Sequence, residues 1–312
     1  MLKTNLTLLN RVAVQSPIVS RNYTSQFAVK HIWQTHDNKV IETGTYAHPD
    51  IRSDVGIEIA TQIGCRLRCI MCASGALKYE RNLTSGEMIE QISEAVRLEG
   101  IKPEEVSKYF YVATMAIGEP ALNAGNVSRT MQWVRENIPG THINLSTTGV
   151  EPDAIRMWAD EISGPVNLAI SLHAPNPDIR RTVIPGMKHT GMEKLLDSLD
   201  YFHARHPSGK KWIVYTPMAG INDSEDNFGE LLKGPLFSRR QFLTLKFLML
   251  NRTSCTEAKG IGPGNIDQAA KWAARTKELG YKDAYVWHAD MNVACGQLAL
   301  DRTSGSMSGG EQ

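Results

Sequence analysis

Residues 64–72, GCRLRCIMC, contain three of the five cysteines of this 312-residue chain. These three are Cys65, Cys69 and Cys72. One loop with this spacing can wrap three thiolates around a compact iron–sulfur cluster and leave one iron open to a substrate. Gly64 and Gly75 would permit the close backbone approach that such a loop requires. The spacing therefore predicts a cluster-binding loop.

A structural zinc site and a chance grouping of buried thiols are the alternatives to a cluster. Structural zinc needs four closed ligands, usually paired as CxxC…CxxC, whereas Cys255 and Cys295 lie far down the chain. Three unrelated buried cysteines within eight residues would be an improbable coincidence. Both alternatives fit the pattern less well than a cluster does.

Short apolar runs alternate with helical patterns on the carboxyl side of residue 56. The predicted strands are 56–63, 109–117, 142–147, 166–173, 211–217, 242–250 and 284–287. The predicted helices are 85–99, with Ser85 as its cap, 124–137, 153–162, 192–206, 225–233 and 266–279. Repeated strand–helix units predict a parallel sheet covered by helices, either open and doubly wound or closed as a barrel.

The domain organisation follows from what flanks these units. Residues 29–33 and 39–43 flank Asp37 and Asn38, which predicts a small hairpin. We expect an N-terminal extension with this hairpin over 1–55, the catalytic core over 56–301, and a disordered Gly/Ser-rich tail over 302–312.

Composition limits the class of protein. The 34 Lys and Arg residues nearly balance the 33 Asp and Glu residues, which argues against a broad basic surface for nucleic acid. An odd, clustered set of cysteines indicates metal ligation in a reducing compartment, the cytoplasm, rather than a disulfide framework. The sequence has no apolar run of about eighteen residues, so no membrane span is expected.

The CxxxCxxC loop after a first strand resembles the hallmark of the radical S-adenosylmethionine (SAM) superfamily. Further stretches resemble one branch, the adenine C-methyltransferases of ribosomal and transfer RNA, which includes the adenine-C2 enzyme and the phenicol-resistance adenine-C8 enzyme. The matching stretches, in order, are 62–65 (QIGC), 81–87 (RNLTSGE), 118–123 (GEPALN), 145–149 (LSTTG), 168–176 (LAISLHAPN) and 294–298 (ACGQL).

This resemblance implies a partial (β/α) barrel that holds a [4Fe-4S] cluster and SAM. Gly118 and Glu119 should meet the amino end of SAM, where a carboxylate suits an ammonium group. The remaining residues implied to line the SAM pocket are Ser146, Ser171, Leu172, His173 and Asn251. An electron donor such as flavodoxin or ferredoxin is also implied.

Cys295 and Glu42 receive catalytic roles from the same resemblance. One SAM should methylate Cys295, and a radical made from a second SAM should then activate that methyl group. A thiolate is readily methylated, whereas an electrophilic ring carbon is not. Glu42 matches the family's general base, which would remove the proton from the methylated carbon.

One position departs from the family. Its members carry another cysteine seven residues before the first cluster cysteine, and that cysteine takes part in product release. Here Glu58 stands at that position. Either Cys255 replaces it, or an external thiol resolves the adduct by exchange, or the final steps differ.

The departures also bear on the substrate. RNA-modifying relatives carry a longer N-terminal helical domain, and residues 287–290 (WHAD) differ from the corresponding RNA-enzyme sequence. The basic pairs Arg180–Arg181, Lys210–Lys211 and Arg239–Arg240 are dispersed and are expected on the solvated surface. We therefore expect methylation of an sp2 carbon in a nitrogen heterocycle, with a small molecule or peptide ahead of RNA adenine.

Two further hypotheses belong to other classes. The chain could use the same fold for another radical reaction, with Cys295 as a relic, or it could be a non-catalytic iron–sulfur protein. The intact stretches at 118–119 and 171–173 argue against the non-catalytic class.

Overall fold

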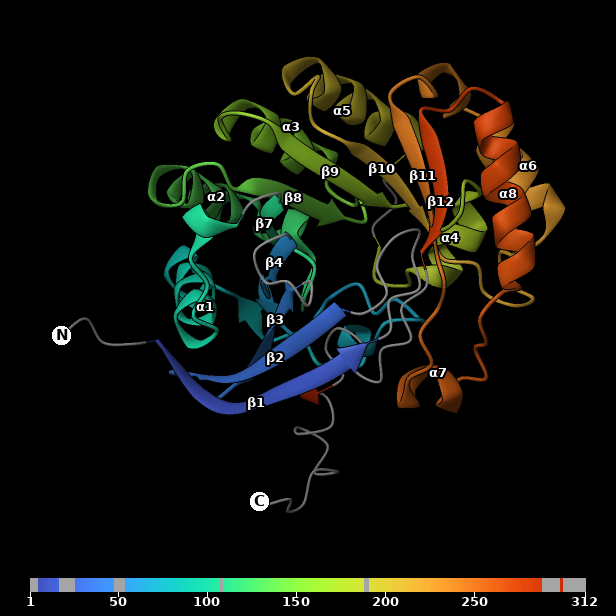
Figure 1. Ribbon diagram of the computed structural model, residues 1–312. Helices are drawn as coiled ribbons and strands as arrows, with labels where there is room; N and C mark the ends of the chain where they lie inside the picture. Colours follow the sequence, from blue (N-terminus) through green and yellow to red (C-terminus); the bar gives the residue numbers. More distant parts are fainter. Residues whose placement is uncertain are drawn as a thin grey trace.

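The computed structural model describes residues 5–16, 26–47, 54–106, 109–187, 191–287 and 298–299. In this part of the chain, ten strands form one sheet in the order β1-β2-β3-β4-β7-β8-β9-β10-β11-β12 (Figure 1). Its strands are β1 (Leu6–Ser16), β2 (Gln26–Thr35), β3 (Val40–Ala47), β4 (Asp54–Glu58), β7 (Tyr109–Ala113), β8 (His142–Thr147), β9 (Val166–Ser171), β10 (Lys211–Tyr215), β11 (Leu243–Leu248) and β12 (Asp283–Trp287). A separate short pair consists of β5 (Gln62–Ile63) and β6 (Arg81–Asn82).

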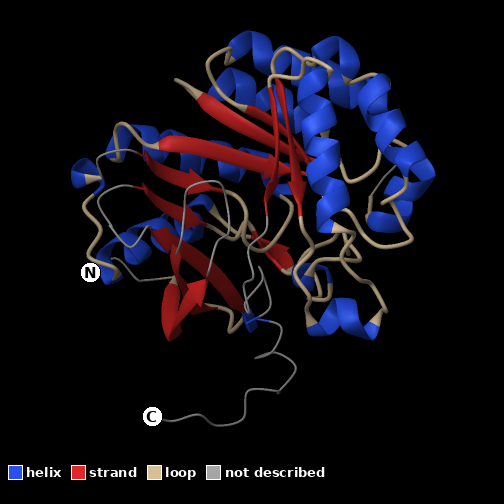
Figure 2. Cartoon of the chain, turned by 45° about the vertical axis from the view of Figure 1, so that its right-hand side comes forward, coloured by secondary structure: helices blue, strands red, loops and turns tan. Residues whose placement is uncertain are grey.

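Strands β1 to β4 pair antiparallel, and every pairing from β4 to β12 is parallel. The described helices flank this sheet, and most of them lie along the outer side of its curved parallel strands (Figures 1 and 2). They are α1 (Ser85–Leu98), α2 (Ala124–Asn137), α3 (Pro152–Glu161), α4 (Pro177–Val183), α5 (Met192–Arg205), α6 (Glu225–Lys233), α7 (Ser254–Ala258) and α8 (Ile266–Glu278), with 3-10 turns η1 (Ala73–Gly75), η2 (Pro103–Glu105), η3 (Pro120–Asn123) and η4 (Phe237–Arg239). This arrangement is the predicted partial (β/α) barrel.

The two faces of the parallel sheet differ in chemistry. On β8, Ile143 and Leu145 are fully buried in the core between sheet and helices, whereas Asn144 and Ser146 are half-buried on the inner face. The inner face carries polar and aromatic groups where a closed barrel usually carries aliphatic ones. For example, Asn167 donates to the side-chain oxygen of Asn144 at 2.7 Å. The inner face is therefore suited to contain a site.

The start of α1 differs from the prediction. Thr84, not Ser85, is the N-cap: its hydroxyl accepts from the backbone N–H of Glu87 at 3.2 Å, and the Glu87 carboxylate accepts from the backbone N–H of Thr84 at 2.8 Å. This capping box satisfies two donors that the helix itself leaves unpaired. Arg81 then joins Glu87 to Asp37 in the β2–β3 turn, with nitrogen–oxygen distances of 2.7 and 2.8 Å.

Most strands end earlier than predicted, and β1 was not predicted at all. The apolar residues past these ends, such as Ile59, Ile117 and Leu172, are buried in loops at the carboxyl ends of the strands. Strand β1 adds a third strand to the predicted hairpin; Leu6 is buried on it, whereas its neighbours Thr7 and Leu8 are exposed. Among the described helices, none has the length and apolar character of a membrane span.

Candidate active site

A cavity of about 300 Å³ opens at the carboxyl ends of the parallel strands, which is where such folds place their chemistry. It brings together residues from the cysteine loop and from the ends of β7 to β11. The lining residues are Cys65, Leu67, Cys69, Met71, Cys72, Ala73, Ser74, Thr114, Met115, Ala116, Gly118, Glu119, Ser146, Thr147, Thr148, Ser171, His173, Thr216, Leu248, Met249, Leu250 and Asn251.

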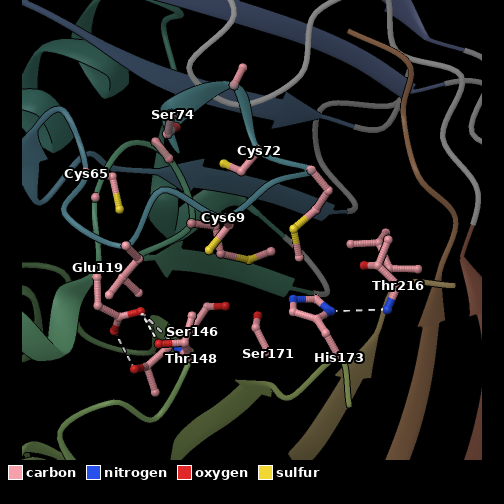
Figure 3. A pocket seen from close by; sticks show the side chains of 18 of the residues that line it. Cys65, Cys69, Cys72, Ser74, Glu119, Ser146, Thr148, Ser171, His173 and Thr216 are labelled. Atoms are coloured by element: carbon pink, nitrogen blue, oxygen red, sulfur yellow. Dashed lines mark hydrogen bonds between the residues drawn. The ribbon is translucent and has the colours of Figure 1, made fainter. Parts of the chain in front are cut away.

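The three clustered cysteines all line this cavity. Figure 3 shows their side chains on one side of the pocket, opposite Ser146, Ser171 and His173. Gly64, just before the loop, has φ +69°, and a Cβ there would lie 2.1 Å from the carbonyl oxygen of Lys78. A Cβ on Gly75 would lie 2.7 Å from the carbonyl oxygen of Cys69. Both glycines are thus required by close backbone approach, as predicted.

Burial and mutual proximity disfavour the ionised form of the Cys65 and Cys69 thiols. Burial raises the pKa of Cys65 to about 12, and the neighbouring Cys72 and Glu119 add to this increase. Burial likewise raises the pKa of Cys69, again with contributions from the adjacent thiols. Three thiolates here would repel one another, so a multiply charged metal centre would stabilise their ionised form.

The spacing of these thiols bears on the kind of metal centre. Across the described ranges, no three Cys, His, Asp or Glu side chains lie close enough to hold one metal ion. Structural zinc takes a closed set of four ligands, whereas a cubane takes each of three thiolates on a different iron. The donor set therefore fits a multi-iron cluster with one iron left for another ligand.

Glu119 contributes a buried carboxylate held by the loop after β8. One oxygen accepts from the backbone N–H of Ala121 at 3.0 Å and from the Thr147 hydroxyl. The other accepts from the backbone N–H and the hydroxyl of Thr148, both at 2.9 Å (Figure 3). Burial raises the pKa of Glu119, and the hydrogen bonds from Thr147 and Thr148 oppose that shift. Its position is fixed, and a cationic ligand would be its complement.

Hydroxyl and imidazole groups form the opposite wall. Ser146 and Ser171 extend into the cavity from the ends of β8 and β9. His173 has φ +59°, and its Nδ1 accepts from the backbone N–H of Thr216 at 3.2 Å. Burial lowers the pKa of His173 to about 3, so this imidazole is neutral near pH 7 and offers Nε2–H as a donor.

The predicted pocket residues separate into two groups. Gly118, Glu119, Ser146, Ser171, His173 and Asn251 line the cavity with the three cysteines. Leu172 does not line it: its side chain is buried in the main core, and its backbone N–H donates to the carbonyl of Val214 at 3.0 Å. Ser171, the last residue of β9, faces the cavity, whereas Leu172, the first residue after it, faces the core.

Glu42 lies on β3, fully buried, with one carboxylate oxygen 3.6 Å from the ammonium of Lys30. Its other oxygen accepts from the backbone N–H of Ala299 at 3.4 Å. Cys295 lies outside the described residues.

Cys255 lies near the start of α7, which packs against η1 of the cysteine loop. It is a free, half-buried thiol and does not line the cavity. Glu58, at the end of β4, is buried, and that burial raises its pKa against the opposing charges of Lys30 and Lys246.

Two of the predicted surface cations are buried. Arg180 is 2% exposed, donates to the carbonyl of Thr148, and has a pKa lowered by burial to about 10, with Glu119 and Cys69 opposing the shift. It thus places a positive charge behind the carboxylate and the thiols. Lys211 is 1% exposed and donates to the carbonyl of Gly209 at 2.7 Å. The prediction that Arg180 and Lys211 lie on the solvated surface was wrong, because the sequence does not show which carbonyl groups surround them.

Sequence reasoning also missed the residues that hold Glu119. Thr147 and Thr148 lie within the 145–149 stretch, but their roles were not recognised. Gln62 accepts from the backbone N–H of Glu119 at 2.9 Å and lies in the 62–65 stretch. Both motifs contained a signal for these hydrogen bonds, because buried polar residues next to an apolar strand end need hydrogen-bond partners.

A partial (β/α) barrel with three thiols on one loop, facing a buried carboxylate across a cavity, defines a radical SAM type of enzyme. The sequence profile of the Radical SAM superfamily matches residues 59–232, more than half of the chain. The chain belongs to the radical SAM superfamily and, within it, to the family of the RlmN methyltransferases.

Two relatives support the membership of the chain in this family. The chain is 31% identical over 303 residues to the probable dual-specificity RNA methyltransferase RlmN of Clostridium novyi, covering 91% of this chain and 80% of that protein. It is 30% identical to the protein of the same name from Thermus thermophilus, covering 88% of this chain and 74% of the relative.

A solved structure agrees with the sequence relatives. A radical SAM methyltransferase from Sphaerobacter thermophilus superposes with a TM-score of 0.76 and 26% identity, covering 94% of this chain and 81% of that chain. Spore photoproduct lyase, at 12% identity and a TM-score of 0.52, shares the fold alone. The protein is a radical SAM methyltransferase.

Proposed function

We propose that this enzyme methylates an sp2 carbon of an adenine base in RNA, using Cys295 as the methyl carrier. The observation that carries the proposal is the match to an RlmN relative over 91% of the chain. This favours RNA adenine over the small-molecule or peptide heterocycle that was expected from the sequence. Methyl transfer to RNA is therefore the first test of this proposal.

The cofactor roles follow from the cavity. Cys65, Cys69 and Cys72 would hold a [4Fe-4S] cluster, and Glu119 would face the ammonium group of SAM, with Ser146, Ser171 and Asn251 beside the rest of that molecule. When bound, the cluster supplies the electron for reductive cleavage of SAM to the 5′-deoxyadenosyl radical. Arg180 offsets the negative charge that the thiolates and Glu119 bring to this buried place.

Glu42 is proposed as the base that accepts the proton of the methylated ring carbon. Its carboxylate is fully buried, with one oxygen 3.6 Å from the ammonium of Lys30. The bond from Ala299 joins Glu42 to the segment that follows Cys295. Successive steps on one acceptor require the carrier thiol and the base to act at one site.

Methyl transfer to RNA is the decisive measurement. Reduced, cluster-loaded enzyme with methyl-labelled SAM is expected to place label on adenine in ribosomal or transfer RNA transcripts. The Cys295→Ala variant should keep its iron yet transfer no methyl. Label on a free heterocycle and none on RNA would contradict the proposal.

The enzyme also needs an electron donor, for which we propose a flavodoxin or ferredoxin. The compartment that we propose for it is the reducing cytoplasm. The described cysteines Cys65, Cys69, Cys72 and Cys255 are free thiols, which supports a reducing environment.

A further inference from the structure

The loop that carries the three clustered cysteines also carries positive charge. Residues 64–79 contain three cationic side chains and no acidic one. Cys65 and Leu67 line the cavity. Arg66 and Arg68, which alternate with them, are exposed to solvent and do not line it. The loop therefore presents a thiol to the cavity and guanidinium groups to the solvent.

These two guanidinium groups have no acidic partner. Among the described residues, no Asp or Glu side chain forms an ion pair with Arg66 or Arg68. An exposed arginine on α1 differs, since Arg97 pairs with Glu94 at 2.6 Å. Arg66 is held instead by an aromatic ring, with its guanidinium carbon 4.3 Å from the centroid of Tyr79. Such a cation–π contact orients the guanidinium group without neutralising its charge.

A third cation reaches the same loop from α7. Lys259, the C-cap of this helix, is exposed, and its ammonium donates to the carbonyl of Ile70 at 3.4 Å. Helix α7 packs against η1, and a Cβ on Gly75 of η1 would lie 3.0 Å from the carbonyl carbon of Arg68. The charge of Lys259 therefore joins the two arginines around the cysteine loop.

The backbone of the loop is held by α4 and the residues that follow it. The backbone N–H of Ile70 donates to the carbonyl of Val183 at 3.0 Å, and that of Gly186 donates to the carbonyl of Leu67 at 2.7 Å. A Cβ on Gly186 would lie 2.1 Å from the carbonyl oxygen of Arg66. The exposed cations thus belong to a fixed backbone, which lowers the cost of ordering them when a partner binds.

We propose that Arg66, Arg68 and Lys259 form the docking surface for the electron donor, an acidic one-electron carrier protein. This inference rests on the proposed function, in which a flavodoxin or ferredoxin supplies the electron. One electron passes from the reduced donor to the cluster, and no bond forms or breaks. Cys65 and Cys69, the proposed cluster ligands, are adjacent to these arginines in sequence. A donor bound here is therefore separated from the cluster by little more than the loop itself.

The position of these cations favours a protein donor over RNA. An acceptor base must enter the cavity to meet the methyl group, because reacting atoms have to be in contact. An electron can cross the loop while its donor stays outside. Arg66 and Arg68 do not line the cavity, so they suit the partner that does not enter it. Charge complementarity with an acidic partner speeds association and is weakened by salt.

The test measures how fast an acidic flavodoxin reduces the cluster, followed anaerobically in the presence of SAM through the visible absorption of the cluster. Arg66→Glu/Arg68→Glu should lower the second-order rate constant by about 10-fold or more, within the range that electrostatic steering adds to association. Reduction by dithionite, a small reductant that needs no docking surface, should stay near the wild-type rate, as should the iron content. Lys271→Glu, which reverses an exposed cation of the outer helix α8 (Figure 1), is the matched control and should change neither rate.

The wild type provides a second measurement that needs no substitution. Raising the salt concentration from about 0.05 M to about 0.5 M should slow reduction by flavodoxin far more than reduction by dithionite, because salt screens exposed charges. If the charge reversal costs the protein its iron, Arg66→Gln/Arg68→Gln with full iron content gives the same comparison of the two reductants.

Three results would overturn the inference. They are a flavodoxin rate that does not depend on salt, equal rates of flavodoxin reduction in wild type and double variant, and equal slowing with both reductants. Weaker binding of RNA with normal reduction by flavodoxin would assign this surface to RNA and overturn it as well. A wild type that shows the expected rates but transfers no methyl to RNA would support the docking surface and overturn only the proposed acceptor.

Discussion

The cavity is lined by three thiols and one carboxylate, and the chemistry of each group depends on its surroundings. Cys65 and Cys69 are thiols whose burial and mutual proximity disfavour ionisation in the absence of a cation. Glu119 is a carboxylate whose two oxygens are fixed by backbone and hydroxyl donors. Single substitutions at these positions are therefore informative.

Replacing one cluster thiol should abolish stable cluster binding. Cys72→Ser is expected to lose the iron and acid-labile sulfide of anaerobically reconstituted protein, because two thiolates do not hold a cubane. Cys255→Ser, in the helix that packs against the same loop, is expected to keep both. Full iron content in Cys72→Ser, or zinc in the wild type, would refute the assignment.

Glu119→Gln should weaken SAM binding with little change in size or shape of the side chain. The amide carries no negative charge, and its NH₂ group would face a donor such as the Thr148 N–H. The expected loss is about 10- to 100-fold in SAM affinity, the range for a hydrogen bond to a charged group. Equilibrium binding to the cluster-loaded protein measures it, and unchanged affinity would show that Glu119 does not meet the ammonium.

Among the elements, α1 shows how a local rule fixes a boundary. The stretch 81–87 contains both Thr84 and Ser85, and either hydroxyl could cap the helix by residue type. Thr84 is the cap because Glu87 lies three residues later and completes a capping box with it. The sequence contained this signal, and the prediction chose the wrong neighbour.

Thr84→Ala should therefore destabilise the protein by about 1 kcal/mol, as is typical for loss of an N-cap hydroxyl. Ser85→Ala is the matched control and should change the free energy of unfolding by much less, since Ser85 is the first residue of the helix itself. Thermal or denaturant unfolding of the two variants checks this. Equal losses would mean that the cap has been assigned to the wrong residue.

Strand ends were predicted less well than strand positions. The pattern placed β8, β9, β10, β11 and β12 correctly, and 142–147 agrees with the observed bounds of β8. It extended β4, β7, β9, β10 and β11 past their carboxyl ends, because buried loop residues such as Ile117 are as apolar as strand residues. Those loops are the ones that form the cavity, so the uncertain boundaries lie at the candidate site.

At the scale of the whole molecule, ion pairs join the N-terminal strands to the barrel. Arg81 connects the β2–β3 turn to α1 through Asp37 and Glu87. The hydrogen bond from Arg81 lowers the pKa of Asp37, and the pKa of Glu87 is also lowered, since Arg81 and Thr84 outweigh the effect of its burial. These carboxylates are therefore more acidic in the folded than in the unfolded chain.

The sign of the pH dependence follows from these lowered values. The stabilisation is present above the unfolded pKa values of about 4 and is lost as the pH falls through the folded values. Arg81→Met should thus lower stability at neutral pH and lessen the further loss between about pH 4 and pH 2. Arg97→Met, which removes an exposed pair with Glu94, is the control and should leave the pH profile unchanged. Urea unfolding across this pH range measures both.

The sequence by itself determined the cysteine loop, the alternation of strands and helices, and the order of the motifs, because these depend on residue type and local spacing. Only the tertiary structure decided which residues meet across the inside of the barrel. Gln62 and Glu119, 57 positions apart, meet at the cavity, and Arg180 was expected on the surface. Curvature of the sheet brings such residues together, and it arises from strand pairing and helix packing over the whole chain, which no local pattern contains.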